Sequence, residues 1–240
     1  MHRIRLRSQF FRVLGGVIFP FFLFGGSPAS AADTGMELLK KDCASCHNLT
    51  GPAPATLQEL WSRKGPDLFY AGNKYKPEWL EGWLQKPGRI RPAGMYYGNH
   101  IKAGEKGDQV DESSLMTHPA LSPGDAKAAA GALMTLKGKS DLIRSGDYQK
   151  GTISSSMGEM VFIKFRGCLA CHEIEPGYGG FSGPEVYTAA KRLQEDYMIS
   201  FMRNPQAWDT KTFMPNKHLT EVDLQKLVHY LRGLSGESEQ

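Results

Sequence analysis

One five-residue pattern occurs twice in the chain, and its two copies use all four cysteines. The first copy runs from Cys43 to His47 (C-A-S-C-H) and the second from Cys168 to His172 (C-L-A-C-H). C-x-x-C-H is the spacing at which haem c is attached to a polypeptide, and on a helix the positions i, i+3 and i+4 share one face. The pattern therefore predicts two covalent haems, with porphyrin bound by Cys43, Cys46, Cys168 and Cys171 and iron bound by His47 and His172.

Paired cysteines also occur in dithiol redox sites and in zinc sites. Two pairs could supply the four thiolates of one zinc ion, but neither zinc nor a redox dithiol requires a histidine directly after each pair. A redox dithiol also needs only one copy. The repeated histidine therefore favours haem, and two haems on a chain with no other thiol indicate electron transfer.

The N-terminus predicts export from the cytoplasm. Four arginines precede or begin a largely apolar stretch of 12 residues, 13–24, and the small residues Ala29, Ser30 and Ala31 supply a cleavage site. Twelve residues are too few to span a bilayer, which needs about 20, so an uncleaved membrane anchor is the less favoured alternative. We expect a signal peptide at residues 1–31 and a mature protein in the periplasm, where bacteria attach haem c.

The charge of the mature chain argues against one class of partner. The whole chain has 29 Lys and Arg against 25 Asp and Glu, and cleavage after residue 31 removes four arginines and no acidic residue. A formally neutral chain gives no electrostatic argument for binding nucleic acid or an anionic membrane surface. We therefore expect no nucleic-acid partner.

An internal repeat extends beyond the two motifs. Residues 65–71 (GPDLFYA) align with 183–189 (GPEVYTA) at an offset of 118, and the alignment continues without a gap to Pro87 and Pro205. Farther along, residues 121–122 align with 219–220 at an offset of 98, so the first copy carries 20 extra residues in between. This self-similarity indicates two domains built from one duplicated unit.

Each copy is predicted to be mostly helical. The expected helices carry the two motifs (36–47 and 157–172), follow the Gly-Pro segments (76–85 and 189–203) and close each copy (123–136 and 221–234). The last helix has an apolar stripe at i, i+3, i+4 and i+7, formed by Leu224, Leu227, Val228 and Leu231. Its counterpart consists of Ala126, Ala129, Ala130 and Leu133. We expect a surface loop in the 20-residue insertion and a linker at 137–156, which is rich in Gly, Ser, Lys and Asp.

The order of these features resembles a class I cytochrome c, which has a C-x-x-C-H helix, a Gly-Pro segment, an Asn-Pro segment, a methionine loop and a closing helix. The resemblance covers residues 33–235, once per half. It implies an all-α fold of two tandem class I cytochrome c domains, each wrapped around one covalent haem. The domains would span 32–137 and 156–240, joined by a linker at 138–155. The first-half insertion and the linker length depart from the family pattern and leave the relative placement of the haems open.

The resemblance also implies the surroundings of each haem. The carbonyl of the Gly-Pro proline would accept a hydrogen bond from the proximal histidine, which assigns Pro66 to the first haem and Pro184 to the second; prolines that only shape turns are the alternative. The methionine loop corresponds to Met214, nine residues after Pro205. A thioether on iron raises the reduction potential and leaves no open position for peroxide. Four aromatic residues at helical spacing would form the pocket walls: Trp79, Trp83, Tyr197 and Phe201.

The sequence leaves several candidates for the sixth ligand of the first haem. Met95 lies eight residues after Pro87, a spacing that resembles the methionine run of mitochondrial-type cytochromes c, and it is the favoured ligand. The repeat supports Met116 instead. His100 or His118 would give bis-histidine ligation, which lowers the potential of a haem relative to methionine ligation.

These features predict a periplasmic di-haem cytochrome c that carries one electron at a time between respiratory redox proteins and is not an enzyme. Its donor and acceptor would bind transiently, and a membrane-bound oxidase or reductase is one candidate partner. Two alternatives stay open: an electron-transfer subunit of a larger oxidoreductase, and a di-haem peroxidase-like enzyme, which needs an iron without a stable methionine. A cysteine-ligated haem enzyme is excluded because the porphyrins take all four cysteines.

Overall fold

The computed structural model of the chain describes residues 31–105, 107–151 and 155–237. Over these residues the fold is mostly helical, with two short antiparallel hairpins. The predicted signal peptide lies outside the described residues except for Ala31, with which the first helix begins. No helix in the described part of the chain has the length and apolar character needed to cross a membrane.

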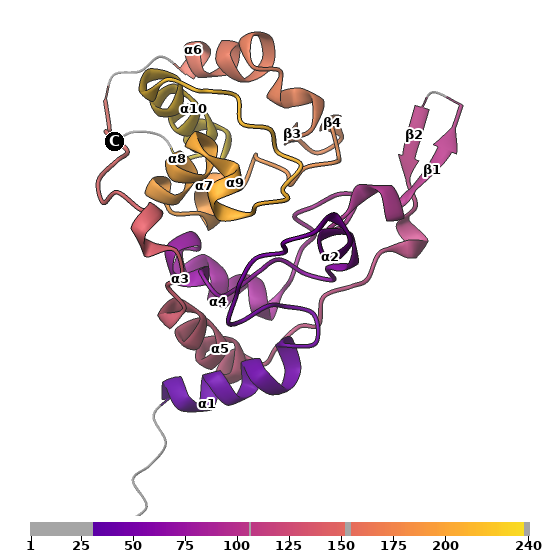
Figure 1. The fold of residues 1–240 in the computed structure, drawn as a ribbon, viewed down its shortest axis with the longest axis vertical. Coiled ribbons are helices and arrows are strands. Elements are labelled where there is room, and N and C mark those ends of the chain that lie inside the picture. The colour runs from indigo at the N-terminus through magenta and orange to yellow at the C-terminus, as the bar shows by residue number, and fades with distance from the viewer. Residues whose placement is uncertain (1–30, 106, 152–154, 238–240) are drawn as a thin grey trace, which may run out of the picture.

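The first half is built from five α-helices and one hairpin. The helices are α1 (Ala31–Leu38), which continues as a π-helical segment (Leu39–Cys43), α2 (Leu57–Ser62), α3 (Ala71–Lys74), α4 (Pro77–Gln85) and α5 (Pro123–Thr135). The insertion that was expected to be a surface loop contains a hairpin of β1 (Ile101–Gly104) and β2 (Gly107–Val110), which projects from the body of the molecule (Figure 1). Short 3-10 turns lie at Tyr97–Asn99, Glu112–Ser114 and Ser140–Leu142.

The second half repeats the motif helix, the two helices after the Gly-Pro segment and the closing helix, but its smaller hairpin directly follows the motif instead of following the helix that lines the cavity. Its elements are α6 (Ser155–Met160), a π-helical segment (Val161–Phe165), a 3-10 turn (Cys168–Ala170), β3 (Glu173–Glu175), β4 (Tyr178–Gly179), α7 (Ala189–Arg192), α8 (Glu195–Arg203), α9 (Pro205–Trp208) and α10 (Glu221–Leu234). Figure 1 shows α1 and α5 at one end of the molecule and α6 and α10 at the other.

The prediction that one helix runs through each motif is wrong in detail. The first helix ends at Cys43, and the second ends at Phe165 because Gly167, at φ +64°, turns the chain before Cys168. The last turn of helical hydrogen bonding survives in both motifs. The backbone N–H groups of His47 and His172 bond the carbonyls of Cys43 and Cys168 at 3.0 and 3.1 Å, so each histidine keeps its place one turn after its first cysteine.

The closing helix packs against the motif helix in the same way in both halves. A Cβ added to Gly35 would lie 2.1 Å from the carbonyl oxygen of Ala128, and one added to Gly158 would lie 2.4 Å from that of Lys226. Ala128 and Lys226 are themselves related by the offset of 98 that relates the two closing helices. The repeated crossing supports the duplication that the sequence indicates.

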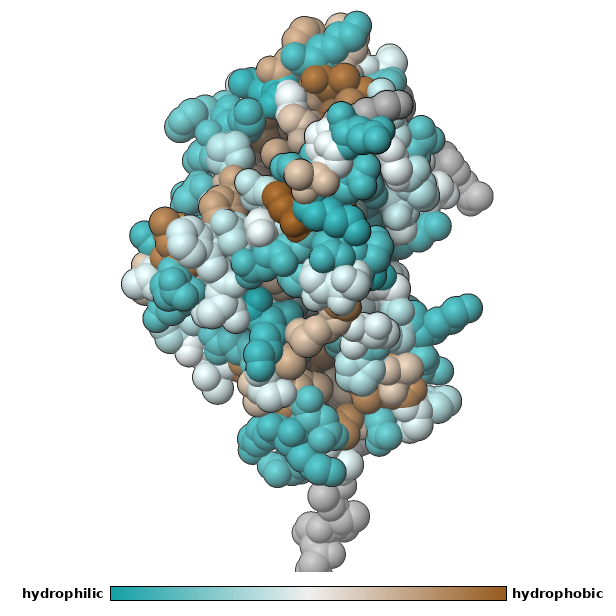
Figure 2. All heavy atoms as spheres, turned by 90° about the vertical axis from the view of Figure 1, so that its right-hand side faces the viewer, coloured by the Kyte–Doolittle hydropathy of each residue, from teal (hydrophilic) through white to brown (hydrophobic). Residues whose placement is uncertain are grey.

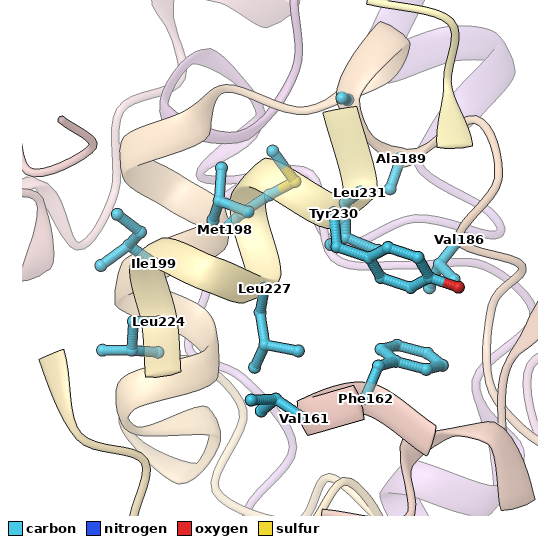
Figure 3. Close-up of a cluster of buried hydrophobic side chains, with 12 residues drawn as sticks. Val161, Phe162, Val186, Ala189, Met198, Ile199, Leu224, Leu227, Tyr230 and Leu231 are labelled. Carbon is cyan, nitrogen blue, oxygen red and sulfur yellow. The ribbon is translucent and has the colours of Figure 1, made fainter. Parts of the chain in front are cut away.

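Both predicted apolar stripes are buried. Every residue of the two stripes is 6% exposed or less. In the second half Leu227 of α10 points toward Val161, and the ring of Tyr230 lies beside that of Phe162, with centroids 5.6 Å apart (Figure 3). The smaller alanine stripe of α5 packs against α1, α3 and α4. On the face shown in Figure 2, hydrophilic side chains are interspersed with small patches of apolar ones.

The two halves meet at a seam with approximate two-fold symmetry. An antiparallel bridge pairs Tyr75 with Leu193, and these two positions are related by the offset of 118. The flanking hydrogen bonds are equivalent under the same offset, and each measures 2.9 Å: Lys76 N to Arg192 O, and Gln194 N to Lys74 O. In an isologous contact of this kind, each half uses the same segment of its own repeat. The predicted helix 189–203 is interrupted at this point because Leu193 and Gln194 take extended backbone to form the bridge.

Side chains and the predicted linker extend the seam. An apolar cluster joins the halves and contains Ala53, Phe69 and Tyr70 from one and Tyr197 and Trp208 from the other. Arg63 reaches Asp209 across the seam at 2.8 Å. Lys139, in the segment expected to be a linker, donates from Nζ to the carbonyls of Ala207 and Trp208 at 2.7 and 2.6 Å. The described part of that segment is bound to both halves, since the N–H of Gly138 bonds the carbonyl of Phe69 and the N–H of Gly146 bonds the carboxylate of Asp196.

Candidate cofactor site

Both C-x-x-C-H motifs line one continuous cavity of about 1580 Å³. Pockets for a single small ligand have about 300–1000 Å³, so this space suits more than one large ligand. Its walls come from both halves and include the four predicted aromatic residues, two on α4 and their equivalents on α8. The fold therefore brings the two motifs, 125 residues apart in sequence, to the same interior space.

Each motif histidine is held by the proline that the sequence assigned to it. Nδ1 of His47 lies 2.8 Å from the carbonyl oxygen of Pro66, and Nδ1 of His172 lies 2.7 Å from that of Pro184. Because a carbonyl oxygen only accepts, each Nδ1 carries the proton and donates it. Each Nε2 then keeps a free lone pair, which is the form in which imidazole binds a metal. Both predicted hydrogen bonds are confirmed, whereas the roles of these residues toward haem stay predictions.

Burial keeps both imidazoles in this neutral form. Removal from water lowers the pKa of His47 and of His172, and the hydrogen bonds to the proline carbonyls only partly oppose the effect. At His172 the positive charges of Arg91 and Arg192 lower the pKa further. Since a histidine must be unprotonated to bind a metal, both side chains are ready to do so at neutral pH.

The glycine of each Gly-Pro pair leaves room for the ring. A Cβ on Gly65 would lie 2.4 Å from Cε1 of His47, and one on Gly183 would lie 2.7 Å from Cε1 of His172. Cβ atoms do not approach other atoms this closely, so any other residue at these positions would displace the ring or the backbone. The Gly-Pro segments, which the repeat relates at an offset of 118, thus have the same function in both halves.

The four cysteines are free thiols, with no disulfide among them. Burial raises the pKa of Cys43 and Cys168, whereas Cys171 is exposed. Among the described residues, which include all four cysteines, no group of three or more His, Cys, Asp or Glu could hold a bare metal ion. The four-thiolate zinc site considered from the sequence is therefore not assembled, whereas haem needs only axial ligands from the protein because porphyrin supplies the others.

The methionines proposed as ligands lie in the cavity wall. Met214 is half-buried, and its backbone is fixed by Gln206, whose Nε2 donates to the Met214 carbonyl at 2.9 Å. Met95 is also half-buried and lines the cavity. Met116 is 69% exposed, which makes it the least suited of the three to close off an iron.

Two first-half histidines differ in their relation to His47. The ring centroid of His118 lies 6.2 Å from that of His47 and 4.7 Å from that of Trp83. His100 lies with its ring edge against Gly94, and its Nδ1 is 2.8 Å from Oγ of Ser114. Of the two, only His118 has a ring contact with the motif histidine among the contacts of the described residues.

Sequence reasoning missed three arginines around the cavity, of which Arg192 is buried and Arg63 and Arg91 are half-buried. Arg63 pairs with Asp67 at 3.1 Å, and Arg192 pairs with Glu185 at 3.4 Å; these acids directly follow the two Gly-Pro pairs. Arg91 also lines the cavity and forms no ion pair with another described residue. Although Arg91 belongs to the first half, its segment is bound to the second, since the Ile90 carbonyl accepts from the N–H of Glu185 at 2.8 Å.

Comparison with known proteins finds no relative of this chain: no family model matches it, and neither does any curated protein or solved structure. The described residues form a mostly helical fold in which the two C-x-x-C-H motifs line one shared cavity.

Proposed function

We propose that the protein is an exported di-haem cytochrome c, made of two tandem class I cytochrome c domains, that carries electrons one at a time between redox proteins. The observation that carries the proposal is the repeated arrangement of each motif. In both halves a neutral imidazole directly follows two thiols, is held through Nδ1 by a Gly-Pro carbonyl, and faces a cavity large enough for two cofactors.

The residues around the cavity fit haem in shape and charge. Haem is a flat apolar ring with two carboxylates, so its pocket needs aromatic or aliphatic walls and nearby cations. The walls include Trp79 and Trp83 on α4 and Tyr197 and Phe201 on α8. Arg91, a cavity-lining cation without an acidic partner among the described residues, is available to a carboxylate of the cofactor.

Haem supplies an iron that gains or loses one electron at a time, and the protein sets the conditions for that exchange. In this proposal His47 and His172 would hold the irons, Met214 would be a second ligand in the second half, and the apolar walls would exclude water. A donor protein loses one electron and an acceptor protein gains it, with no bond made or broken in this chain. Because the motifs share one cavity, electrons can pass between the halves inside the molecule.

The mass and absorbance of the mature protein test this proposal. After expression in the periplasm of a host that attaches haem c, we expect the chain mass plus that of two haems, and reversible reduction at both. The double variant Cys168→Ser/Cys171→Ser should retain one covalent haem. Ser45→Ala, a change at a non-attaching position of the first motif, should retain both. A chain that weighs only what its amino acids weigh would overturn the proposal.

A further inference from the structure

We propose that His118 is the sixth ligand of the iron in the first half, so that His47 and His118 bind this haem from opposite sides. The inference rests on the proposed function because it concerns the ligands of one of its haems. It differs from the favoured sequence-based prediction, which places Met95 in this position.

The separation of the two rings carries the proposal. With metal–nitrogen bonds of about 2.0 Å, two imidazoles that bind one metal ion from opposite sides have ring centres about 6 Å apart. The centroids of His47 and His118 lie 6.2 Å apart. Tilted rings in direct contact can have the same separation, as Phe162 and His172 do at 6.4 Å, so the distance is the one that shared binding of a metal requires and the test below distinguishes the two cases. The angle of 52° between the ring planes is compatible with such binding because each ring can rotate about its own bond to the metal.

The hydrogen bond of His118 leaves the correct nitrogen free. Its Nδ1 lies 2.8 Å from the carbonyl oxygen of Pro119, which can only accept, so Nδ1 carries the proton and Nε2 keeps its lone pair. His47 has the same tautomer for the same reason. Trp83 packs against His118 with centroids 4.7 Å apart and is itself fixed by a 3.0 Å hydrogen bond from Nε1 to the Gly88 carbonyl. The ring of His118 is therefore held in place.

The sequence around His118 matches that of the proposed ligand in the other half. Met214 is followed by Pro215, and His118 is followed by Pro119; both pairs precede the residue that caps the closing helix, Thr220 or Ser122. The first-half segment is shorter by two residues between the ligand and the cap. The offset of 98 places Met116 at the position of Met214, so the His-Pro pair corresponds to the Met-Pro pair only with a two-residue gap before the cap.

The alternative residues lack these features. Met116 is 69% exposed. His100 is directed by its contacts to Gly94 and Ser114, and no ring contact joins it to His47 among the described residues. Met95 lines the same cavity, and the test below compares it directly with His118. Among the ring contacts of the described residues, His118 is the candidate that combines a ring 6.2 Å from the motif imidazole with a free nitrogen.

The consequence is an asymmetry between two otherwise similar halves. A methionine ligand raises the potential of a haem relative to a second histidine. The first haem would then have the lower potential, and an electron entering there would pass to the second. Replacement of one ligand type by the other in a duplicated unit thereby gives electron flow a direction.

Ligand-specific absorption of the fully loaded protein tests the assignment. The weak near-infrared band from sulfur to ferric iron counts methionine-ligated haems, and we expect one equivalent per two haems. His118→Met should add a second equivalent. His118→Gly should let the reduced first haem bind carbon monoxide, and added imidazole should suppress that binding. Met95→Leu, the matched control, should leave the band and the carbon monoxide response unchanged, whereas Met214→Leu should abolish the band.

The outcomes separate this inference from the proposed function. Two equivalents of the band in the unmodified protein, or loss of one equivalent in Met95→Leu, would overturn the assignment while leaving a di-haem protein. A mature chain without covalent haem would overturn the proposed function instead. If the His118 variants do not retain haem, the band count of the unmodified protein and the Met95→Leu result still decide between the two ligands.

Discussion

At the scale of single residues, the orientation of each motif histidine is set by the two residues of the Gly-Pro pair. The proline carbonyl fixes which nitrogen carries the proton, and the glycine leaves space for the ring. At metal sites, the hydrogen bond made by the histidine nitrogen that does not bind the metal determines the orientation of the ring and the basicity of the ligand. The same two contacts occur in both halves; the family resemblance implied the proline contact, whereas the glycine contact was not predicted.

The glycine can be tested separately from the proline. In Gly183→Ala the new Cβ would lie 2.7 Å from Cε1 of His172 and 2.9 Å from the backbone oxygen of Cys171. We expect the ring to move and the hydrogen bond to Pro184 to be lost. The haem that we propose for the second half should then become open to carbon monoxide, measured by absorbance of the reduced protein. Gly82→Ala, on α4 with nothing within 4 Å of the new Cβ, should leave both haems unchanged. An unaltered second haem in Gly183→Ala would contradict this account of the ring's position.

Other residues of the site were not predictable from the sequence. Arg91 belongs to no motif, and it comes close to His172 only because the fold binds residue 90 to Glu185 of the other half. His118 was one candidate among several, since spacing along the chain does not determine which ring faces His47. A sequence motif identifies residues that are close together in the chain. The wall of a cavity is formed by segments that are far apart in the sequence and that only the fold brings together.

At the scale of helices, the prediction was most accurate where the determinants are local. Both closing helices lie within one residue of their predicted ends, because each has a polar cap and a continuous apolar stripe. The helix expected at 189–203 is instead broken at Leu193, which pairs with Tyr75. In the first half Pro77 marks the start of α4. Its equivalent, Glu195, gives no such signal, and the partner strand is 118 residues away.

Because the motif helix and the closing helix cross closely in both halves, replacing a glycine at the crossing should lower the free energy of unfolding. In Gly158→Ala the new Cβ would lie 2.4 Å from a backbone carbonyl of α10, and a backbone atom inside a helix cannot move aside without displacing the helix. Overpacking of this kind costs about 1–3 kcal/mol of unfolding free energy, measurable by denaturant titration. Gly131→Ala, on α5 with open space around it, should instead stabilise the protein by about 0.5–1 kcal/mol. Equal effects of the two variants would show that the crossing is not close-packed.

At the scale of the whole molecule, the seam makes the two halves depend on each other. The backbone bridge, the apolar cluster and the Arg63–Asp209 pair all cross it, and the connecting segment is bound along its described length. Repeats that contact each other extensively gain stability from the interface as well as from each repeat. The insertion and the linker length left the relative placement of the proposed haems open in the sequence, and neither segment of the seam carries a local pattern that indicates its partner.

Trp208 offers a direct test of this dependence, because it is fully buried in the cluster that joins the halves and donates from Nε1 to Oγ of Ser200 at 3.0 Å. Ser200 in turn donates to the carbonyl of Leu142 in the connecting segment at 2.7 Å, so one side chain supports both the cluster and the connection. Trp208→Ala should cost about 3–5 kcal/mol and divide a single thermal transition into two, followed by the absorbance of each haem. Phe165→Ala, at a ring that is 62% exposed, should keep one transition near the original temperature. Two separate transitions in the unmodified protein would mean that the halves fold independently despite the seam, and that the shared cavity does not couple their stability.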